Sequence, residues 1–504
     1  MLIAFITPLV SWASEKARNV LVVTSLIFVG FLVLFLARDI YINGLHIYTL
    51  GASSATLTIP EHYMVPVRII LEVDGMSIFM GIVIATVSIA AAIYSLSFMK
   101  EETGRTRFYT LLMLLVAGML GMAFTGDLFN LFVFLEIASI AGAALAAFRI
   151  RFADTSEGGF KYIIISSIAA LMVLFAIGLF YAQYNLLNIA ALAQVMQYTS
   201  LDKIALMILV AAFVMKLGGV PLHMWTPDTY TVAPAGITAM LVVASQVCMY
   251  ALFRTCFTLY GITLDIVTVG WIVIIFGVLS MFIGVTMALP QIDIKRLMAY
   301  HAISQSGYML LGVGVGLAVL GNPQALSSYG IDAMSGGIFH IINHALYKGL
   351  LFLTAGALFY RTGTRDLNKM GGLAHKMKWT SIFFIIGALS ISGIPPLNGF
   401  ASKILIYESV YQFNPILAII AMIVSILTLA SFTKVFHSAF MGPELHEYKN
   451  VNEVPRSMMI GMSILALIII FFSLFPGQVV DWLARPAAEA LINQAAYING
   501  VMGN

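Results

Sequence analysis

Long apolar stretches, separated by short polar segments, recur along the whole chain. Runs of this length are typical of helices that cross a bilayer, because a helix satisfies its own backbone hydrogen bonds in lipid. The period of two that marks a half-buried strand is not evident, so we predict an all-α integral membrane protein. The apolar runs predict about fourteen transmembrane helices, near residues 2–13, 19–37, 74–97, 107–124, 126–148, 158–184, 203–222, 235–258, 266–288, 297–318, 335–360, 379–411, 414–440 and 457–475.

The composition supports this class. The 504 residues are 61% hydrophobic and only 10% charged, whereas charged residues make up roughly 25% of an average soluble domain. The net charge of +3, without a dense basic tract, argues against a nucleic-acid partner. The two cysteines, Cys248 and Cys256, have neither the number nor the spacing of a zinc or iron–sulfur site. We therefore expect no metal and no cofactor in this chain.

Basic residues are distributed unevenly between the predicted loops. The odd-numbered loops hold 17 lysines and arginines, and the even-numbered loops hold 4. Because cytoplasmic loops carry the excess of positive charge, we expect the odd-numbered loops in the cytoplasm, both termini outside, and the chain in the cell membrane. The four basic residues of the even-numbered loops are Arg38, Arg68, Lys203 and Arg254.

The two ends of the chain carry weaker signals. The segment from Met1 to Ala13 lacks the basic start of a signal peptide, since its charges follow the apolar run, and we interpret it as a short first helix. The segment from Val479 to Ala496 looks amphipathic, which favours a helix lying along the membrane interface.

Two glycine–proline segments interrupt apolar runs in similar ways. Gly219 to Leu222 closes the seventh predicted helix, and Gly393 to Leu397 breaks the twelfth. Proline breaks a helix because it lacks a backbone donor, and paired breaks in two halves indicate an inverted repeat. We therefore predict helices 1–3 in residues 1–106, a five-helix repeat in 107–258, a second in 262–440, and a last helix with an amphipathic tail in 441–504.

Two ionisable residues lie in the first predicted repeat. Glu136 is in the middle of an apolar helix, where an ionised carboxylate is costly unless paired. It either makes a structural hydrogen bond or binds a proton in concert with Lys216. Lys216 lies about one and a half turns before the first break, and burial makes a lysine lose its proton readily. Snorkelling is the alternative for Lys216, and Asp127 fits a helix N-cap.

A histidine–lysine series marks the eleventh predicted helix. His340, His344 and Lys348 follow one another at intervals of four, which sets them on one helix face. Histidine titrates near neutral pH, so the spacing favours a proton relay. The same pair of histidines can bind a metal, but no nearby carboxylate or cysteine completes such a site.

The remaining polar positions complete this pattern. Lys403 follows the second break as Lys216 precedes the first, and Glu408 is an alternative partner for it. Lys434 lies near a helix end, where snorkelling is expected. His223 extends the polar line from Lys216 in one interpretation, while Trp225 and Asp228 anchor the helix end.

Several segments resemble one membrane-protein family. KLGGVPLHMWTPD (216–228), DIKRLMAYHAISQSGYM (293–309), HIINHALYKGLLFLTAG (340–356) and IPPLNGFASK (394–403) are similar to motifs of the antiporter-like subunits shared by respiratory complex I and Mrp-type sodium/proton antiporters. LEVDGMS (71–77) and DLFNLFVFLEI (127–137) add weaker matches. The length and the lysine in GFASK resemble most the Mrp D subunit and its counterpart in archaeal membrane-bound hydrogenase and sulfur-reducing complexes.

The resemblance implies a fold and a set of roles. It implies fourteen helices, two inverted repeats, partner membrane subunits, and a mid-membrane path for H⁺ and for Na⁺ in some members, with no redox site in this chain. Glu136 and Lys216 would form the input pair, and His340, His344 and Lys348 would relay protons to Lys403.

One departure from the family pattern concerns the eighth helix. The family usually has a lysine four residues before a tyrosine, and aligned on Tyr250 that position is Gln246. Glutamine can hold a water wire but cannot take up or release a proton near neutral pH. The leading expectation is a proton-translocating subunit, and the alternative is a structural subunit with an interrupted path. A catalytic oxidoreductase subunit would need thiolates or a nucleotide loop, which the sequence lacks.

Overall fold

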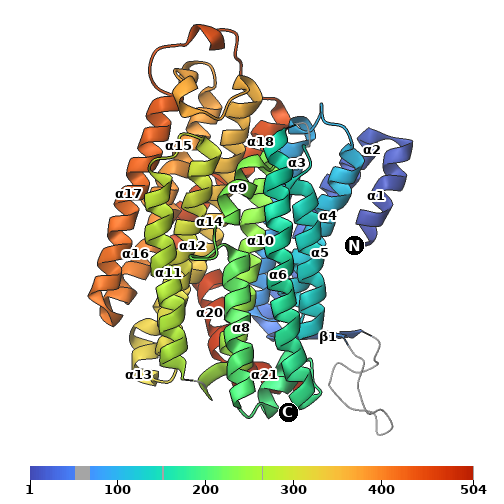
Figure 1. The fold of residues 1–504 in the computed structure, drawn as a ribbon, viewed down its shortest axis with the longest axis vertical. Helices are drawn as coiled ribbons and strands as arrows, with labels where there is room; N and C mark the ends of the chain where they lie inside the picture. Colours follow the sequence, from blue (N-terminus) through green and yellow to red (C-terminus); the bar gives the residue numbers. More distant parts are fainter. Residues whose placement is uncertain (51–68, 150–151, 264, 503–504) are drawn as a thin grey trace.

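Long helices run along the length of the molecule in the computed structural model, which describes residues 1–50, 69–149, 152–263 and 265–502 (Figure 1). Ten helical stretches in this part of the chain are long and apolar enough to cross a membrane. The chain is therefore a mostly helical, multi-pass membrane protein. These stretches lie in α2 (Glu15–Asn43), α3 (Gly75–Phe98), α4 (Arg105–Phe124), α5 (Leu128–Ala146), α6 (Ala153–Tyr184), α10 (Ala235–Phe253), α11 (Ile266–Ala288), α14 (Ile331–Thr362), α17 (Pro415–Ala439) and α18 (Arg456–Leu474), and α12 (Ile294–Ala318) is a further long helix.

The two predicted helix breaks are present. Helix α8 (Ser200–Leu217) ends at Gly218, which has a φ of 74°, and helix α9 (Trp225–Val232) follows the break. Helix α15 (Lys378–Ser392) ends at Gly393, with a φ of 73°, and α16 (Asn398–Phe413) follows. Glycine adopts this left-handed conformation without a Cβ penalty, and the prolines beyond it cannot continue the helix.

The centre of the bundle consists of α10, α12 and α14. Nearly every side chain of these three helices is buried, as expected for helices that contact protein on all sides. Helix α6, by contrast, exposes an apolar stripe at intervals of three and four residues, which suits contact with lipid. The stripe consists of Phe160, Ile164, Ile168, Leu171 and Phe175.

A small antiparallel sheet lies outside the helices, contrary to the all-α prediction. Strand β1 (His46–Leu50) pairs with β2 (Ile69–Val73), with Ile47 opposite Glu72. Each strand has only five residues, too short for an alternating pattern to stand out between apolar helices. The link between the strands, including Arg68, lies outside the described residues, as does Arg151.

Three basic residues assigned to loops lie instead in buried helical positions. Arg18 stacks on Tyr109 in the first turns of α2. Lys295 donates to the Ala233 carbonyl from α12. Arg254 lies in a π-helical continuation of α10, η1 (Arg254–Tyr260). The prediction failed at these positions because hydropathy does not reveal that each side chain has a partner inside the protein.

The two ends of the chain pack against the bundle. Helix α1 (Leu2–Ala13) forms as predicted, and it packs against α2 and α4. The C-terminal segment is helical, but α20 (Arg485–Ile492) packs its apolar face against α3 and α14, and α21 (Gln494–Met502) packs against α7 (Ile189–Val195) and η1. Figure 1 shows α21, β1 and α13 (Pro323–Ala325) at the same end of the bundle.

The remaining elements are short connections. They are η2 (Gly261–Thr263), η3 (Leu326–Gly330), η4 (Leu367–Lys369), η5 (Leu373–His375), η6 (His446–Tyr448), α19 (Pro476–Val479) and η7 (Val480–Ala484).

Candidate functional site

The first part of the site lies where α8 ends at its break. Lys216 is only 5% exposed, and its Nζ donates to Ser139 Oγ on α5. Glu136 lies one turn before Ser139 on the same helix and interacts electrostatically with Lys216. The two form no ion pair within the described part of the chain. The structure thus brings Lys216 close to Glu136 but places Ser139, which the sequence analysis did not single out, in direct contact.

A small cavity of about 10 Å³ adjoins Lys216. This volume approaches what a single water molecule needs. Its lining includes Ser139, Trp225 and Ser245, so polar groups are available to bind water next to the lysine. His223 is also buried in the break that follows Lys216.

Gln246 connects helix α10 to helix α14. From α10, its side-chain nitrogen lies 2.8 Å from His344 Nδ1 and donates to the Ile341 carbonyl at 2.9 Å on α14. His344 Nδ1 accepts this hydrogen bond, so in the neutral ring the proton resides on Nε2. The position at which the sequence departs from the family pattern is therefore a direct contact between α10 and α14.

The histidine–lysine series lies along α14, and each of its side chains contacts a neighbouring helix. His340 contacts Ser402 Oγ of α16 at 2.9 Å, and its Nε2 lies 3.1 Å from the Tyr347 hydroxyl. Lys348 donates to the Met298 carbonyl of α12 at 2.6 Å. The described residues contain no cluster of three metal-ligating side chains.

The side chain of Lys403 spans the second helix break, from α16 to α15. Its Nζ, on α16, donates to the Ile391 carbonyl in the last turn of α15 at 2.7 Å and to Ser425 Oγ at 2.9 Å. A cation at a helix C-terminus is stabilised by the unpaired carbonyls there. Glu408 is exposed and makes no ion pair with Lys403 among the described contacts. Lys434 donates to the Leu289 and Gln291 carbonyls.

Helix α12 has a polar face that was not predicted from the sequence. His301, Gln305 and Tyr308 are completely buried. Gln305 lies 3.3 Å from His340 Nε2, and the Tyr308 ring lies 4.8 Å from Lys403 Nζ. Neither nitrogen of His301 has a hydrogen-bond partner within the described residues. Their spacing of four and then three residues could have identified them by the same rule that identified the series on α14.

Acidic residues at helix ends have structural roles. Asp127 caps α5, as predicted, by accepting from Asn130 N at 2.7 Å, and burial raises its pKa to about 6. Asp228 joins α9 to Lys161 of α6 and Arg296 of α12. Burial acts to raise the pKa of Asp228, but these two cations hold it below its ordinary value.

Comparison with known proteins identifies the family. Residues 125–428 match the family described as NADH:quinone oxidoreductase/Mrp antiporter, transmembrane region. Residues 63–109 match the N-terminal region of NADH-ubiquinone oxidoreductase (complex I) chain 5. The D subunit of the Na⁺/H⁺ antiporter of Alkalihalophilus pseudofirmus is 34% identical over 93% of this chain and 91% of its own length.

Solved structures share the fold. A chain of the Mrp complex from Dietzia sp. DQ12-45-1b superposes with a TM-score of 0.86 at 22% identity, covering 100% of this chain and 98% of that one. A chain of an archaeal membrane-bound sulfane sulfur reductase gives 0.84 at 24% identity, covering 99% and 97%. The resemblance predicted from the motifs is thereby confirmed, and the chain belongs to the antiporter-like membrane subunit family shared by NADH:quinone oxidoreductases and Mrp antiporters.

Proposed function

We propose that this chain translocates protons as the antiporter-like subunit of a multi-subunit cation/proton antiporter or redox-driven pump. The relatives named above belong to such complexes, and we infer partner membrane subunits for this chain as well. The proposed path begins at Glu136 and Lys216, passes Gln246, and continues through the series on α14 to Lys403. Both termini are proposed to lie on the outer side of the cell membrane.

The burial of three lysines without carboxylate contacts carries this proposal. Lys216, Lys348 and Lys403 are at most 5% exposed, and in the described structure their hydrogen bonds go to hydroxyl groups and backbone carbonyls. A buried ammonium without a paired anion is costly. Such a lysine readily gives up its proton, which is what a relay requires.

The test compares two lysines of the same helix. Lys216→Met keeps the length of the side chain and removes the titrating amine. Lys203→Met, on an exposed position of α8, is the matched control. We expect Lys216→Met to lower proton flux by about tenfold or more in liposomes containing the assembled complex, and Lys203→Met to leave it unchanged. Native flux in both Lys216→Met and Glu136→Gln would contradict the proposal.

Gln246 supports the alternative of a structural subunit with an interrupted path. The amide joins α10 to α14 by a hydrogen bond to His344, yet it cannot carry a proton itself near neutral pH. The relay therefore requires water molecules that carry the proton past the contact between Gln246 and His344. The structural alternative requires only that contact.

A further inference from the structure

A cluster of buried charged residues lies away from the proposed path. Arg254 donates two hydrogen bonds of 2.7 Å to the two carboxylate oxygens of Asp74, the N-cap of α3. Glu72, two residues earlier on β2, is 1% exposed. Asn188 donates to Glu72 at 2.6 Å, and the Tyr497 hydroxyl of α21 also donates to it.

The Glu72 carboxyl group packs closely against Gly126 and Asn188. A Cβ on Gly126 would overlap the Glu72 carboxyl group. The side chain of Asn188 is fixed in turn, since it also donates to the Gly126 carbonyl at 3.2 Å. The carboxyl group thus occupies a site formed by β2, α7, α21 and the residue before Asp127.

The net charge of this cluster favours the binding of one proton by Glu72. Asp74 and Arg254 cancel each other when both are ionised, so an ionised Glu72 leaves one net negative charge in a buried site. Protonation of Glu72 removes that charge, and burial favours the neutral form. The pKa of Glu72 is raised to about 7 by burial, which outweighs the hydrogen bonds from Tyr497 and Asn188 and the charge of Arg254.

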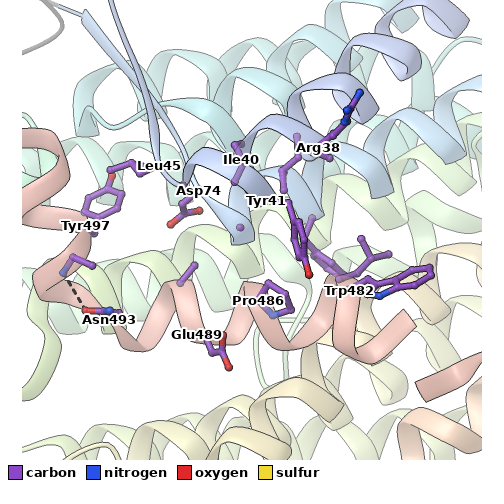
Figure 2. Close-up of a pocket in the computed structure, with 18 residues that line it drawn as sticks. Arg38, Ile40, Tyr41, Leu45, Asp74, Trp482, Pro486, Glu489, Asn493 and Tyr497 are labelled. Carbon is purple, nitrogen blue, oxygen red and sulfur yellow. Dashed lines mark hydrogen bonds between the residues drawn. The ribbon is translucent and has the colours of Figure 1, made fainter. Parts of the chain in front are cut away.

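A cavity lies on the other side of Tyr497. Its volume is about 730 Å³, and it lies between α2, the start of α3, α20 and α21. Figure 2 shows Tyr497 and Asp74 at one end of this cavity and Trp482 at the other. The cavity adjoins α21, which lies with β1 at the end of the bundle that the distribution of basic residues predicts to be external (Figure 1).

A line of polar contacts leads from the cluster towards the centre. Arg254 donates to the Tyr250 hydroxyl at 3.2 Å, and this hydroxyl lies 3.0 Å from Ser77 Oγ. Tyr250 and Gln246 are four residues apart on α10 and therefore lie on one helix face. One helical turn therefore separates Tyr250, which contacts the cluster, from the contact between Gln246 and His344.

We propose that Glu72 is a proton-exchange site that takes up and releases one proton towards the outer cavity, past the side chain of Tyr497. In this step a Glu72 carboxylate and a hydronium ion become a carboxylic acid and water, and the reverse step returns the proton to the cavity. The contribution of Glu72 to transport rests on the proposed function, whereas its protonation does not.

The first test measures protonation directly. Infrared difference spectra of the purified complex, taken between acidic and basic pH, should contain a carboxylic acid band that titrates near pH 7 and is lost in Glu72→Gln. Glu489→Gln is the matched control, because Glu489 lines the same cavity but is exposed. A native spectrum without such a band, or a band that remains in Glu72→Gln, overturns the proposal.

The second test measures transport. With the complex in liposomes and a fixed potassium diffusion potential, proton flux in the native complex should depend on outer pH with a midpoint near 7. Glu72→Gln should abolish this dependence, and Glu489→Gln should retain it. If Glu72→Gln fails to assemble, Tyr497→Phe serves instead. Loss of its hydrogen bond to the carboxylate should move the midpoint to higher pH, and an unmoved midpoint contradicts the proposal.

Lys216→Met in the same preparation separates the two proposals. If Lys216→Met lacks flux while Glu72→Gln keeps the native pH dependence, Glu72 is not the exchange site and the proposed relay stands. If both Lys216→Met and Glu136→Gln retain native flux, the relay is wrong, and the infrared band alone decides whether Glu72 exchanges its proton.

Discussion

At the scale of single residues, the contrast between the buried cations is informative. Lys216, Lys348 and Lys403 donate hydrogen bonds to uncharged oxygen atoms, whereas Arg254 binds Asp74 with a bidentate pair of hydrogen bonds. The guanidinium stays charged at any physiological pH and matches the two carboxylate oxygens, so this pair suits a permanent structural link. Lysines without such a carboxylate partner are able to change their protonation.

The ion pair of Asp74 and Arg254 makes a stability prediction. Asp74→Asn keeps the N-cap but leaves a buried guanidinium unpaired, and we expect a loss of about 3–5 kcal/mol in unfolding free energy. The double variant with Arg254→Gln should recover part of this loss. Thermal unfolding in detergent measures both, with Asp39→Asn as the control because its pair with His46 is partly exposed. Equal shifts for Asp74→Asn and Asp39→Asn would contradict the prediction.

At the scale of elements, the broken helices position the lysines. Lys216 lies in the last turn of α8, and Lys403 reaches across its break to a carbonyl of α15. The ends of α15 and α16 must approach closely for this contact to form. Gly399 permits this approach, since a Cβ there would overlap the Ser390 carbonyl oxygen.

We therefore expect Gly399→Ala to separate α16 from α15. The added methyl group meets backbone, which cannot move aside, and overpacking of this kind costs about 1–3 kcal/mol. Thermal unfolding should show this loss, and proton flux should fall because Lys403 loses its carbonyl contact. Gly178→Ala is the control, with nothing within 4 Å of the added Cβ on helix α6. If both variants behave alike, the close approach is not required.

At the scale of the whole molecule, the central helices α10, α12 and α14 hold the polar groups away from lipid. Peripheral helices such as α6 present apolar side chains on the outside of the bundle. Because lipid cannot hydrate a charge, this arrangement is what allows ionisable side chains to persist at membrane depth. The contact between Gln246 and His344 joins α10 to α14 within this centre.

Substitution of Gln246 tests whether the two halves work as one path. Under the proposed relay, Gln246→Leu removes the polar contact and should lower flux by about tenfold, whereas Gln246→Lys should pump no faster than the native chain. Flux assays of the reconstituted complex compare the three. A native chain no faster than Gln246→Leu, with a clear gain in Gln246→Lys, would instead establish the structural alternative.

The sequence by itself determined the membrane class and both helix breaks, and it indicated the residues of the path that we propose. These features depend on local properties, since hydropathy, glycine–proline chemistry and a spacing of four residues act within one segment. The sequence also identified the correct family, because each family motif is a continuous segment that can be recognised without the structure. The predicted division into repeats and the orientation rest on the sequence alone.

Only the tertiary structure decided which side chains meet. Ser139 at Lys216, the polar face of α12 at His340, and Asp74 at Arg254 all come from segments distant in sequence. The burial of Glu72 could not be predicted from the sequence either. Its strand has only five residues, so the alternation of polar and apolar positions is weak, and the Tyr497 side chain that contacts it comes from the C-terminal helix. Contacts between distant segments depend on how helices pack, and no local pattern encodes that packing.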